Sequence, residues 1–441
     1  MARTTGTPTD RVHFVLLIYL AVFVSLNALV WGWFLLHQNV PHRFPLGPPV
    51  ERFGDLVRFT AKHQIGTDSA MVDSEHLFGT LFPKNYLPFA AAIYIFLLQK
   101  CAPYAVLVFT ALVLAGTATA ATALWLHVRH FPSYRWYVGL SIFATALFGW
   151  GTEITLMRGN IEGILVLFIF LGAYFHAKRR YGAAGVAFAF ATCIKPYPIL
   201  WFLLLGRHRK FRAMGIGLAT GIVVTFGSLF VFDHNPIHAW HVTHGGSNFV
   251  SNYIICFRAL QETMTDHSIL ETMKTVTRVI LNGGTNFGYK ENLMSAPNNP
   301  LARFLYYVDL CVSAVVTLYV VEKVWNMPVL NQVFALACVT TLLPPVTGDY
   351  TLTILLVPMA LGLVFLLQDA AEGRTPVSVG NLLWFVLPCA WIMAINPLWP
   401  LHGVLKCLAL LALLGASLSV PLPTTLFGEV VQVDHRAMAE A

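Results

Sequence analysis

The chain has 441 residues, of which 57% are hydrophobic and only 11% are charged, and its formal net charge is +7. Together with a mean hydropathy of +0.66, this composition indicates a polytopic membrane protein and excludes an ordinary soluble enzyme. The positive charge is that expected of loops beside a membrane, so it gives no reason to expect a nucleic-acid partner.

Long apolar runs recur along the chain, and a hydrocarbon core of about 30 Å requires roughly 17–25 such residues of a helix. We expect twelve spans, near residues 13–37, 103–127, 136–151, 160–176, 182–194, 196–206, 213–232, 303–321, 328–345, 351–368, 379–396 and 400–419. The first run is too long for a signal-peptide core, so it is expected to stay as a span. The predicted fold is an all-α bundle forming one integral membrane domain over 1–441. Two large polar segments interrupt it, at 38–102 and 233–302.

The first polar segment contains Arg52-Phe-Gly-Asp55-Leu-Val-Arg58, just after the first span. An ionisable group that a bundle of spans holds at the membrane surface is a candidate for a functional site. An acid in a loop is also commonly a solvated charge or a helix N-cap, so position alone leaves both interpretations of Asp55 open.

The apolar run Tyr86–Leu98 decides which loops share a side of the membrane. It is short for a span, and Pro83 and Pro88 mark its start, so we expect a helix lying on the outer surface. The short loops on one side then hold Arg129, Arg135, Lys178, Arg179, Arg180, Arg207, Arg209, Lys210, Arg212, Lys323 and Arg374, and those on the other side hold only Arg158 and Lys195. By the positive-inside rule, the first side and both termini are cytoplasmic, and the two large polar segments face outward.

The segment Thr192-Cys-Ile-Lys-Pro-Tyr-Pro198 breaks a helix at the expected outer face. Two prolines within three residues cannot continue a helix, and the preceding run of 182–194 is only about 20 Å long at 1.5 Å per residue. Broken backbone at membrane depth lines a protein-enclosed or wet cavity, where a lysine needs an anion. Alternatively, the apolar part of the Lys195 side chain is buried and its ammonium group extends to the water at the membrane interface.

Other polar segments near this face have simpler explanations as well. In Met157-Arg-Gly-Asn-Ile-Glu162, the acid would also favour a helix N-terminus. Gly348-Asp349-Tyr350 follows two prolines, so turn chemistry explains it equally.

Four histidines, at positions 234, 238, 241 and 244, have spacings that could gather them on one helix face. Pro236 and the glycine pair at 245–246 interrupt that stretch, and the chain has no HExxH, so we expect phosphate or sugar contacts and no metal. A P-loop, a GxSxG motif and a dinucleotide fingerprint are also absent from the sequence, so we expect no cofactor.

The order of these motifs resembles the GT-C class of membrane glycosyltransferases, and within it glycosyltransferase family 87. Gly54-Asp55-Leu56 resembles the outer-loop acid of the family, and Phe82-Pro-Lys-Asn-Tyr-Leu-Pro88 resembles its aromatic-Pro-Pro segment with one proline missing. Arg158-Gly-Asn160 and the run from Gly185 to Lys195-Pro resemble its Gly-Gln/Asn and Ala-Gly…Lys-Pro runs. Leu343-Pro-Pro-Val-Thr-Gly-Asp349-Tyr350 resembles its late Pro-x-x-x-Asp/His-Tyr turn.

The resemblance implies a polyprenyl-phosphate-mannose-dependent mannosyltransferase of cell envelope biosynthesis in the plasma (inner) membrane. Such an enzyme moves mannose, or a related hexose or pentose, from the lipid-linked donor to an envelope lipid or glycan acceptor on the outer face, with inversion. Asp55 would be the catalytic base, and the donor phosphate would be bound by Lys195, Arg258 and Arg158. The substrate-binding residues would be Lys84, Asn160, Glu162, His241, His244, Asn252, Asp349 and Tyr350, with no metal and no cofactor.

Two other functions are compatible with the sequence. A transporter or lipid flippase would use broken helices and buried charges equally well, although no repeat relates the two halves and large outward segments are unusual for alternating access. A catalytically silent relative that scaffolds an envelope complex would explain the proline missing between Phe82 and Asn85.

The charge asymmetry of the loops yields a testable topology. Single cysteines near Gly66 and Gly283 should react with a membrane-impermeant thiol reagent from outside, and those near Tyr181 and His208 only from inside. Labelling of positions 66 and 181 from the same side would refute this topology.

Overall fold

The computed structural model describes residues 8–37, 87–101, 104–128, 139, 141–142, 145–244, 267–281, 300–344, 348–371, 378–394 and 402–422. Its helices are α1 (Pro8–His37), α4 (Pro88–Lys100), α5 (Ala105–Val128), α7 (Trp150–Arg158), α8 (Glu162–Ala177), α9 (Tyr181–Ile194), α10 (Leu203–Arg207), α11 (Phe211–Leu229), α12 (Pro236–His244), α13 (Ile269–Leu281), α14 (Pro300–Val324), α15 (Val329–Leu342), α16 (Leu356–Ala371), α17 (Val379–Met393) and α18 (His402–Ser419). Two 3-10 helices, η3 (Tyr197–Phe202) and η5 (Asp349–Leu355), precede α10 and α16. The described residues contain no β-strand, which confirms the all-α prediction.

Six described helical segments are long and apolar enough to cross a membrane: Asp10–Gly32, Ala105–Ala123, Phe211–Leu229, Phe304–Val324, Asp349–Leu366 and His402–Ser419. Shorter apolar helices lie among them. Large apolar side chains such as Leu29, Ile222 and Val315 are exposed on the outside of the bundle. So much exposed apolar surface is expected where lipid is the solvent, and it confirms a polytopic membrane protein.

The helices fall where the apolar runs predict them along most of the described chain. The runs near 13–37, 103–127, 160–176, 213–232, 303–321, 328–345, 379–396 and 400–419 correspond to α1, α5, α8, α11, α14, α15, α17 and α18. The run 136–151 is only partly described, and its end begins α7. The run 351–368 begins in η5, a tighter helix, before α16 continues it.

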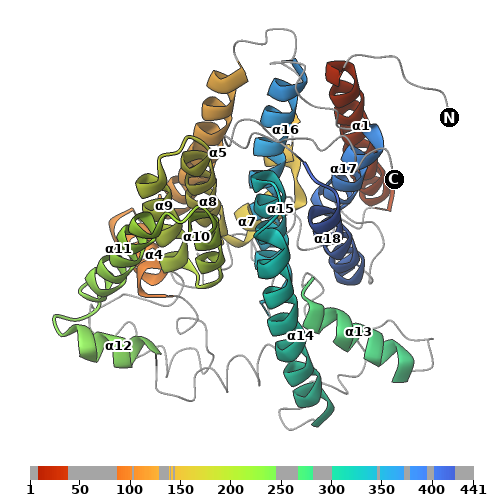
Figure 1. Cartoon of the computed structure of the whole chain (residues 1–441). Coiled ribbons are helices and arrows are strands. Elements are labelled where there is room, and N and C mark those ends of the chain that lie inside the picture. Colours follow the sequence, from red (N-terminus) through yellow and green to blue (C-terminus); the bar gives the residue numbers. More distant parts are fainter. Residues whose placement is uncertain are drawn as a thin grey trace.

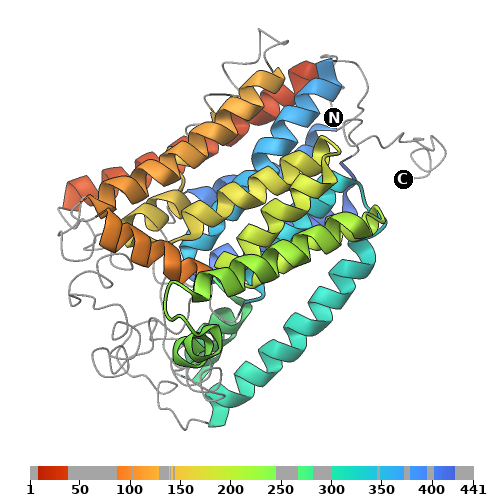
Figure 2. The same ribbon diagram turned by 90° about the vertical axis from the view of Figure 1, so that its left-hand side faces the viewer.

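Two groups of helices pack on either side of a central seam (Figure 1). One group contains α4, α5, α8, α9 and α11, and the other contains α1, α17 and α18, with α15 packed on α18. The seam consists of α7, η5 and α16, and η5 contacts helices of both groups. Figure 2 shows that the long helices run in a common direction, as the spans of one membrane do.

Glycines allow three helices of the first group to approach closely. A Cβ at position 185 of α9 would collide with the backbone of Ala213 in α11, and one at 217 would lie 2.6 Å from the carbonyl oxygen of Gly185. A Cβ at position 172 of α8 would likewise collide with the ring of Phe188 in α9. Small residues at these crossings bring backbones together, which is a main source of helix association in membranes.

Two short helices, α12 and α13, lie at one end of the bundle (Figure 1). The buried face of α13 includes Leu270 and the ion pair of Lys274 Nζ with Glu271 Oε2, at 2.7 Å, while Val276 and Ile280 are exposed. Both helices belong to the second large polar segment of the sequence. That this end of the bundle faces outward stays a prediction, as does the surface position of α4, which packs on α9 and α11.

A buried polar cluster at the start of η5 joins several elements. Asp349 Oδ1 lies 3.1 Å from His267 Nδ1, and Asp349 Oδ2 lies 2.6 Å from His402 Nε2 and 3.7 Å from Lys406 Nζ. Trp150 Nε1 also donates a hydrogen bond to Oδ2. All five side chains are buried.

The partners of Asp349 come from three separate parts of the chain. Trp150 begins α7, His267 lies just before α13, and His402 and Lys406 are one turn apart on α18. A carboxylate in the interior needs such partners, because an unpaired buried charge is costly. The cluster therefore connects α7, the start of α13 and α18 to η5, whose second residue is Tyr350.

Asp349→Asn should destabilise the protein, because it leaves Lys406 buried without a counter-charge. Breaking a buried ion pair from one side costs about 3–5 kcal/mol, so the Tm of the purified protein in detergent should fall clearly. Adding Lys406→Met should recover part of the loss, because the orphaned charge is then gone.

The matched control is Asp233→Asn. Asp233 is partly exposed, and the backbone N–H of Asn235 and then the side chain of His238 hold its pKa below the ordinary value. The Tm should not change in this variant. If Asp349→Asn were equally silent, the cluster would not support the fold.

Candidate active site

Lys195 lies at the predicted break in the helix. α9 ends at Ile194, and Lys195 is extended, with φ −143° and ψ 150°, as expected of a residue before proline. The chain then continues through η3 and α10. The prediction of two short helices meeting at Lys195 is therefore confirmed.

The turn between α7 and α8 brings Glu162 to the same place. Gly159 has φ 64°, a left-handed conformation that glycine adopts without strain, and this residue reverses the chain after α7. The side-chain oxygen of Asn160 then accepts a hydrogen bond of 3.1 Å from the backbone N–H of Glu162, the first residue of α8. The amide of Asn160 thus helps to begin the helix.

Tyr94 of α4 fixes this turn from the other side. Its hydroxyl donates to the carbonyl oxygen of Gly159 at 3.1 Å and accepts from the backbone N–H of Ile161 at 2.9 Å. Both backbone groups are buried, so the tyrosine satisfies polar atoms that would otherwise be unpaired.

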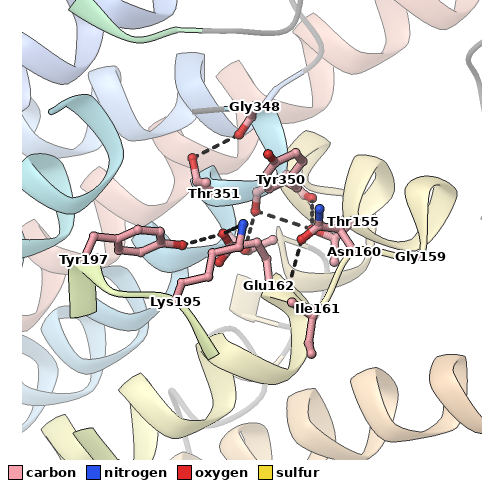
Figure 3. A network of polar contacts seen from close by, with 12 residues as sticks. Thr155, Gly159, Asn160, Ile161, Glu162, Lys195, Tyr197, Gly348, Tyr350 and Thr351 are labelled. Atoms are coloured by element: carbon pink, nitrogen blue, oxygen red, sulfur yellow. Dashed lines mark hydrogen bonds and ion pairs between the residues drawn. The ribbon is translucent and has the colours of Figure 1, made fainter. Parts of the chain in front are cut away.

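Glu162 and Lys195 form an ion pair inside the bundle (Figure 3). Lys195 Nζ lies 2.6 Å from Glu162 Oε1, and Tyr197 Oη donates a hydrogen bond to the same oxygen. The glutamate side chain is completely buried, whereas 18% of the lysine side chain is exposed. Among the described residues Glu162 Oε2 has no hydrogen-bond partner. The pair therefore fixes a lysine that can still be reached from one side.

Lys195 and a second cation, Arg158, both lie over the ring of Tyr350. Lys195 Nζ lies over this ring at 4.8 Å from its centre, and Arg158 Cζ lies over it at 5.8 Å. Thr353 Oγ1 donates a hydrogen bond of 2.6 Å to the carbonyl oxygen of Tyr350 and holds that backbone in place. Figure 3 shows Tyr350 beside Lys195 and Glu162.

The charges of this group favour an anionic ligand. Two cations, Lys195 and Arg158, lie over the ring of Tyr350, and the carboxylate of Glu162 is paired with the lysine. Charge-assisted hydrogen bonds from lysine and arginine are the usual means of holding a phosphate.

The structure gathers six of the sequence-predicted site residues around the seam: Arg158, Asn160, Glu162, Lys195, Asp349 and Tyr350. Four others, Asp55, Lys84, Asn252 and Arg258, lie outside the described residues. His241 and His244 fall on α12, of which only the backbone is described at these two positions.

Asp349 differs from the other gathered residues because protein groups bond to both of its oxygens. Its contact with a substrate stays a prediction. The histidine bonded to Asp349 Oδ1 is His267, and His267 Nε2 lies 3.3 Å from Thr351 Oγ1, the order of groups found in hydrolase triads. Thr351 is only 1% exposed and donates its proton to the carbonyl oxygen of Gly348, so it is no nucleophile.

Several residues of the two clusters escaped the sequence analysis: Trp150, Tyr94, Tyr197, His267, His402 and Lys406. A signal existed for two of them. Lys406 is a charge within an apolar run, and His402 precedes it by four residues and so shares its helix face. In the part of the chain that the structure describes, no group of three or more His, Cys, Asp or Glu residues could hold a metal ion.

Comparison with known families now identifies the type of protein. The model of glycosyltransferase family 87 matches residues 85–344, which is more than half of the chain. The match includes Arg158, Glu162 and Lys195, whereas Asp55 precedes it and Tyr350 follows it. No curated protein matches the chain. The chain therefore belongs to glycosyltransferase family 87 and is a membrane glycosyltransferase.

Proposed function

We propose that the protein transfers a sugar from a polyprenyl-phosphate donor to a lipid or glycan acceptor of the cell envelope. The sugar is mannose or a related hexose or pentose, and the reaction takes place at the outer face of the plasma (inner) membrane. The observation that carries the proposal is the pair of cations, Lys195 and Arg158, over the ring of Tyr350. Outside the cytoplasm nucleotide sugars are not available, so the donor needs a lipid carrier, and its phosphate needs cations.

The cations act most strongly on the leaving group. As the bond from the anomeric carbon to the phosphate oxygen breaks, the polyprenyl phosphate gains negative charge. A cation fixed beside that oxygen stabilises the transition state more than the substrate, which lowers the barrier.

Glu162 and Tyr197 hold the ammonium group of Lys195 in place. Their contacts hold Lys195 Nζ before any substrate binds, so this side chain does not have to be ordered during the reaction. The glutamate also explains how a lysine is tolerated at this depth, because its charge is already balanced when the site is empty of donor.

In the proposed reaction Asp55 is the general base. Its carboxylate takes the proton of the acceptor hydroxyl while the acceptor oxygen bonds to the anomeric carbon and the bond to phosphate breaks. One displacement of this kind inverts the anomeric configuration. Arg258 is proposed as a further phosphate contact, and Lys84, Asn160, His241, His244, Asn252 and Asp349 as contacts of sugar or acceptor.

The direct test uses purified protein in detergent with radiolabelled polyprenyl-phosphate sugars and an envelope lipid extract as acceptor. Transfer of label to a new product, with release of the polyprenyl phosphate, supports the proposal. Binding of the labelled lipid without any transfer would favour a lipid transporter.

Lys195→Met should reduce donor affinity or turnover about tenfold or more, the scale of a lost charge-assisted contact of roughly 1.5–3 kcal/mol. The Tm should also fall, because Glu162 is then a buried charge without its partner. Radiolabel kinetics and thermal unfolding measure the two effects separately.

The double variant Glu162→Gln with Lys195→Met is the matched control for Lys195. Removing both charges should restore the Tm, while turnover stays low, because the phosphate still lacks its cation. If the double variant turned over within about threefold of wild type, Lys195 would have only a structural role.

Asp55→Asn should lower turnover by about 10²–10⁴, the usual loss of a general base, while donor binding and Tm stay the same. The substitution keeps the shape of the side chain and removes its basic oxygen. Asp73→Asn and Glu75→Gln, in the same polar segment, should be nearly silent. Turnover of Asp55→Asn within about threefold of wild type would refute the assignment.

A further inference from the structure

Two turns at the far ends of α8 and α10 carry a dense group of positive charges. The first turn follows α8 and the second follows α10, and their cations are Lys178, Arg179 and Arg180, and Arg207, Arg209, Lys210 and Arg212. We call them the basic turns. Glu162 begins α8 and Lys178 follows its last residue, so the basic turns lie about 24 Å along the helix from the proposed active site.

The basic turns lie side by side. The rings of His176 and His208, one beside each turn, are 5.0 Å apart between centres. Lys210 Nζ from the second turn lies 4.6 Å from the ring centre of Tyr181, the residue that follows the first turn. The close approach of α9 and α11 at Gly185 holds the two turns together. Their charges therefore act as one group.

Both turns have the same backbone. After α8, the N–H of Arg179 bonds to the carbonyl of His176 and that of Arg180 bonds to Phe175. After α10, Arg209 and Lys210 make the equivalent bonds, to Gly206 and Leu205. This is the Schellman motif, whose left-handed position favours glycine. Here arginine occupies it twice, at φ 58° for Arg179 and φ 51° for Arg209.

The same motif elsewhere in the chain uses glycine. After α7, Gly159 takes the left-handed position at φ 64°, with its N–H bonded to Leu156. The motif itself therefore does not require arginine. Because a left-handed backbone is unfavourable for a residue with a Cβ, the two arginines strain the turns. A charged side chain at a strained backbone position is a reason to look for a function of that charge.

The excess charge is not balanced within the neighbouring sequence. From Gly163 to Phe232 the chain has no Asp or Glu. Arg179, Arg180 and Arg209 are exposed, and in the described part of the chain they form no ion pair. Burial, and then the neighbouring Arg207 and Lys210, lower the pKa of His208, so the histidine carries less positive charge at neutral pH than an ordinary imidazole.

We propose that the basic turns bind the phosphate of an anionic phospholipid headgroup on the membrane face that carries them. Both turns connect apolar helices, so their cations lie at the level of lipid headgroups. Phe211 follows the second turn and is 64% exposed, in the position where an aromatic ring meets the lipid interface. A soluble phosphate would gain nothing from that ring. Basic pockets between helix ends are known lipid headgroup sites in general.

The test titrates short-chain phosphatidylglycerol, with phosphatidylcholine as the neutral reference, into the purified full-length protein in detergent and follows the Tm. Wild type should be stabilised by phosphatidylglycerol alone, and less so at high salt. In Arg179→Gly with Arg209→Gly, the apparent affinity for phosphatidylglycerol should fall about tenfold or more. The Tm without lipid should stay equal or rise, because glycine relieves both left-handed positions. A merely structural role for the arginines would lower it instead.

Two controls localise the effect. Arg179→Lys with Arg209→Lys keeps both charges, so its affinity should lie within about threefold of wild type. Lys323→Gln, outside the basic turns at the end of α14, should also bind like wild type. The proposal is overturned if the double glycine variant keeps its affinity within twofold, or if Lys323→Gln loses as much. It is equally overturned if inorganic phosphate stabilises the protein as strongly as phosphatidylglycerol at the same concentration.

Discussion

The charge of Asp349, buried where the two groups of helices meet, must be balanced inside the protein. Lipid offers no water to do this, so the partners come from Trp150, His267, His402 and Lys406. Lys406 also lies over the ring of Trp150, at 5.4 Å from its centre. Satisfying one carboxylate thus sets the places of α7, α18 and the segment before α13. Tyr350 follows directly in the chain, so the position of its ring depends on the same balance.

The lengths of the apolar runs and the positions of the prolines were sufficient to predict most of the described helices and the break at Lys195. Apolar run length reflects membrane thickness, and prolines act locally, so both signals can be read from neighbouring residues. The pairing of Lys195 with Glu162 could not be read in this way. The two residues are 33 positions apart, and only the turn at Gly159 and the contact of α8 with α9 bring them together. His267 and His402 lie still farther from Asp349 in the chain, and their contacts depend on how whole helices pack.

The structure also changes the interpretation of Lys195 that the sequence alone suggested. From sequence, its charge suggested an absent anion, to be supplied by the substrate. In the fold, Glu162 is a resident anion, and Tyr197 shares its oxygen. A phosphate that approaches Lys195 therefore meets a cation already paired from behind, with Arg158 as the second positive group near Tyr350. A buried ion pair fixes the positions of its groups more than it adds to the stability of the fold. Here Glu162 fixes the direction in which the ammonium group of Lys195 points.

The glycines at 185 and 217 bring the backbones of α9 and α11 into direct contact. At this crossing no Cβ separates the two backbones, and Cys193 Sγ of α9 also contacts the carbonyl of Gly221 and the hydroxyl of Thr225 in α11, so we expect the two helices to tilt together as one lever. One end of α9 carries Lys195, and the other begins beside the basic turns. A rotation that widened the space around the lysine would carry α11 along and move the arginines relative to the lipid surface. The two ends of the lever are therefore mechanically linked, although no side chain connects them.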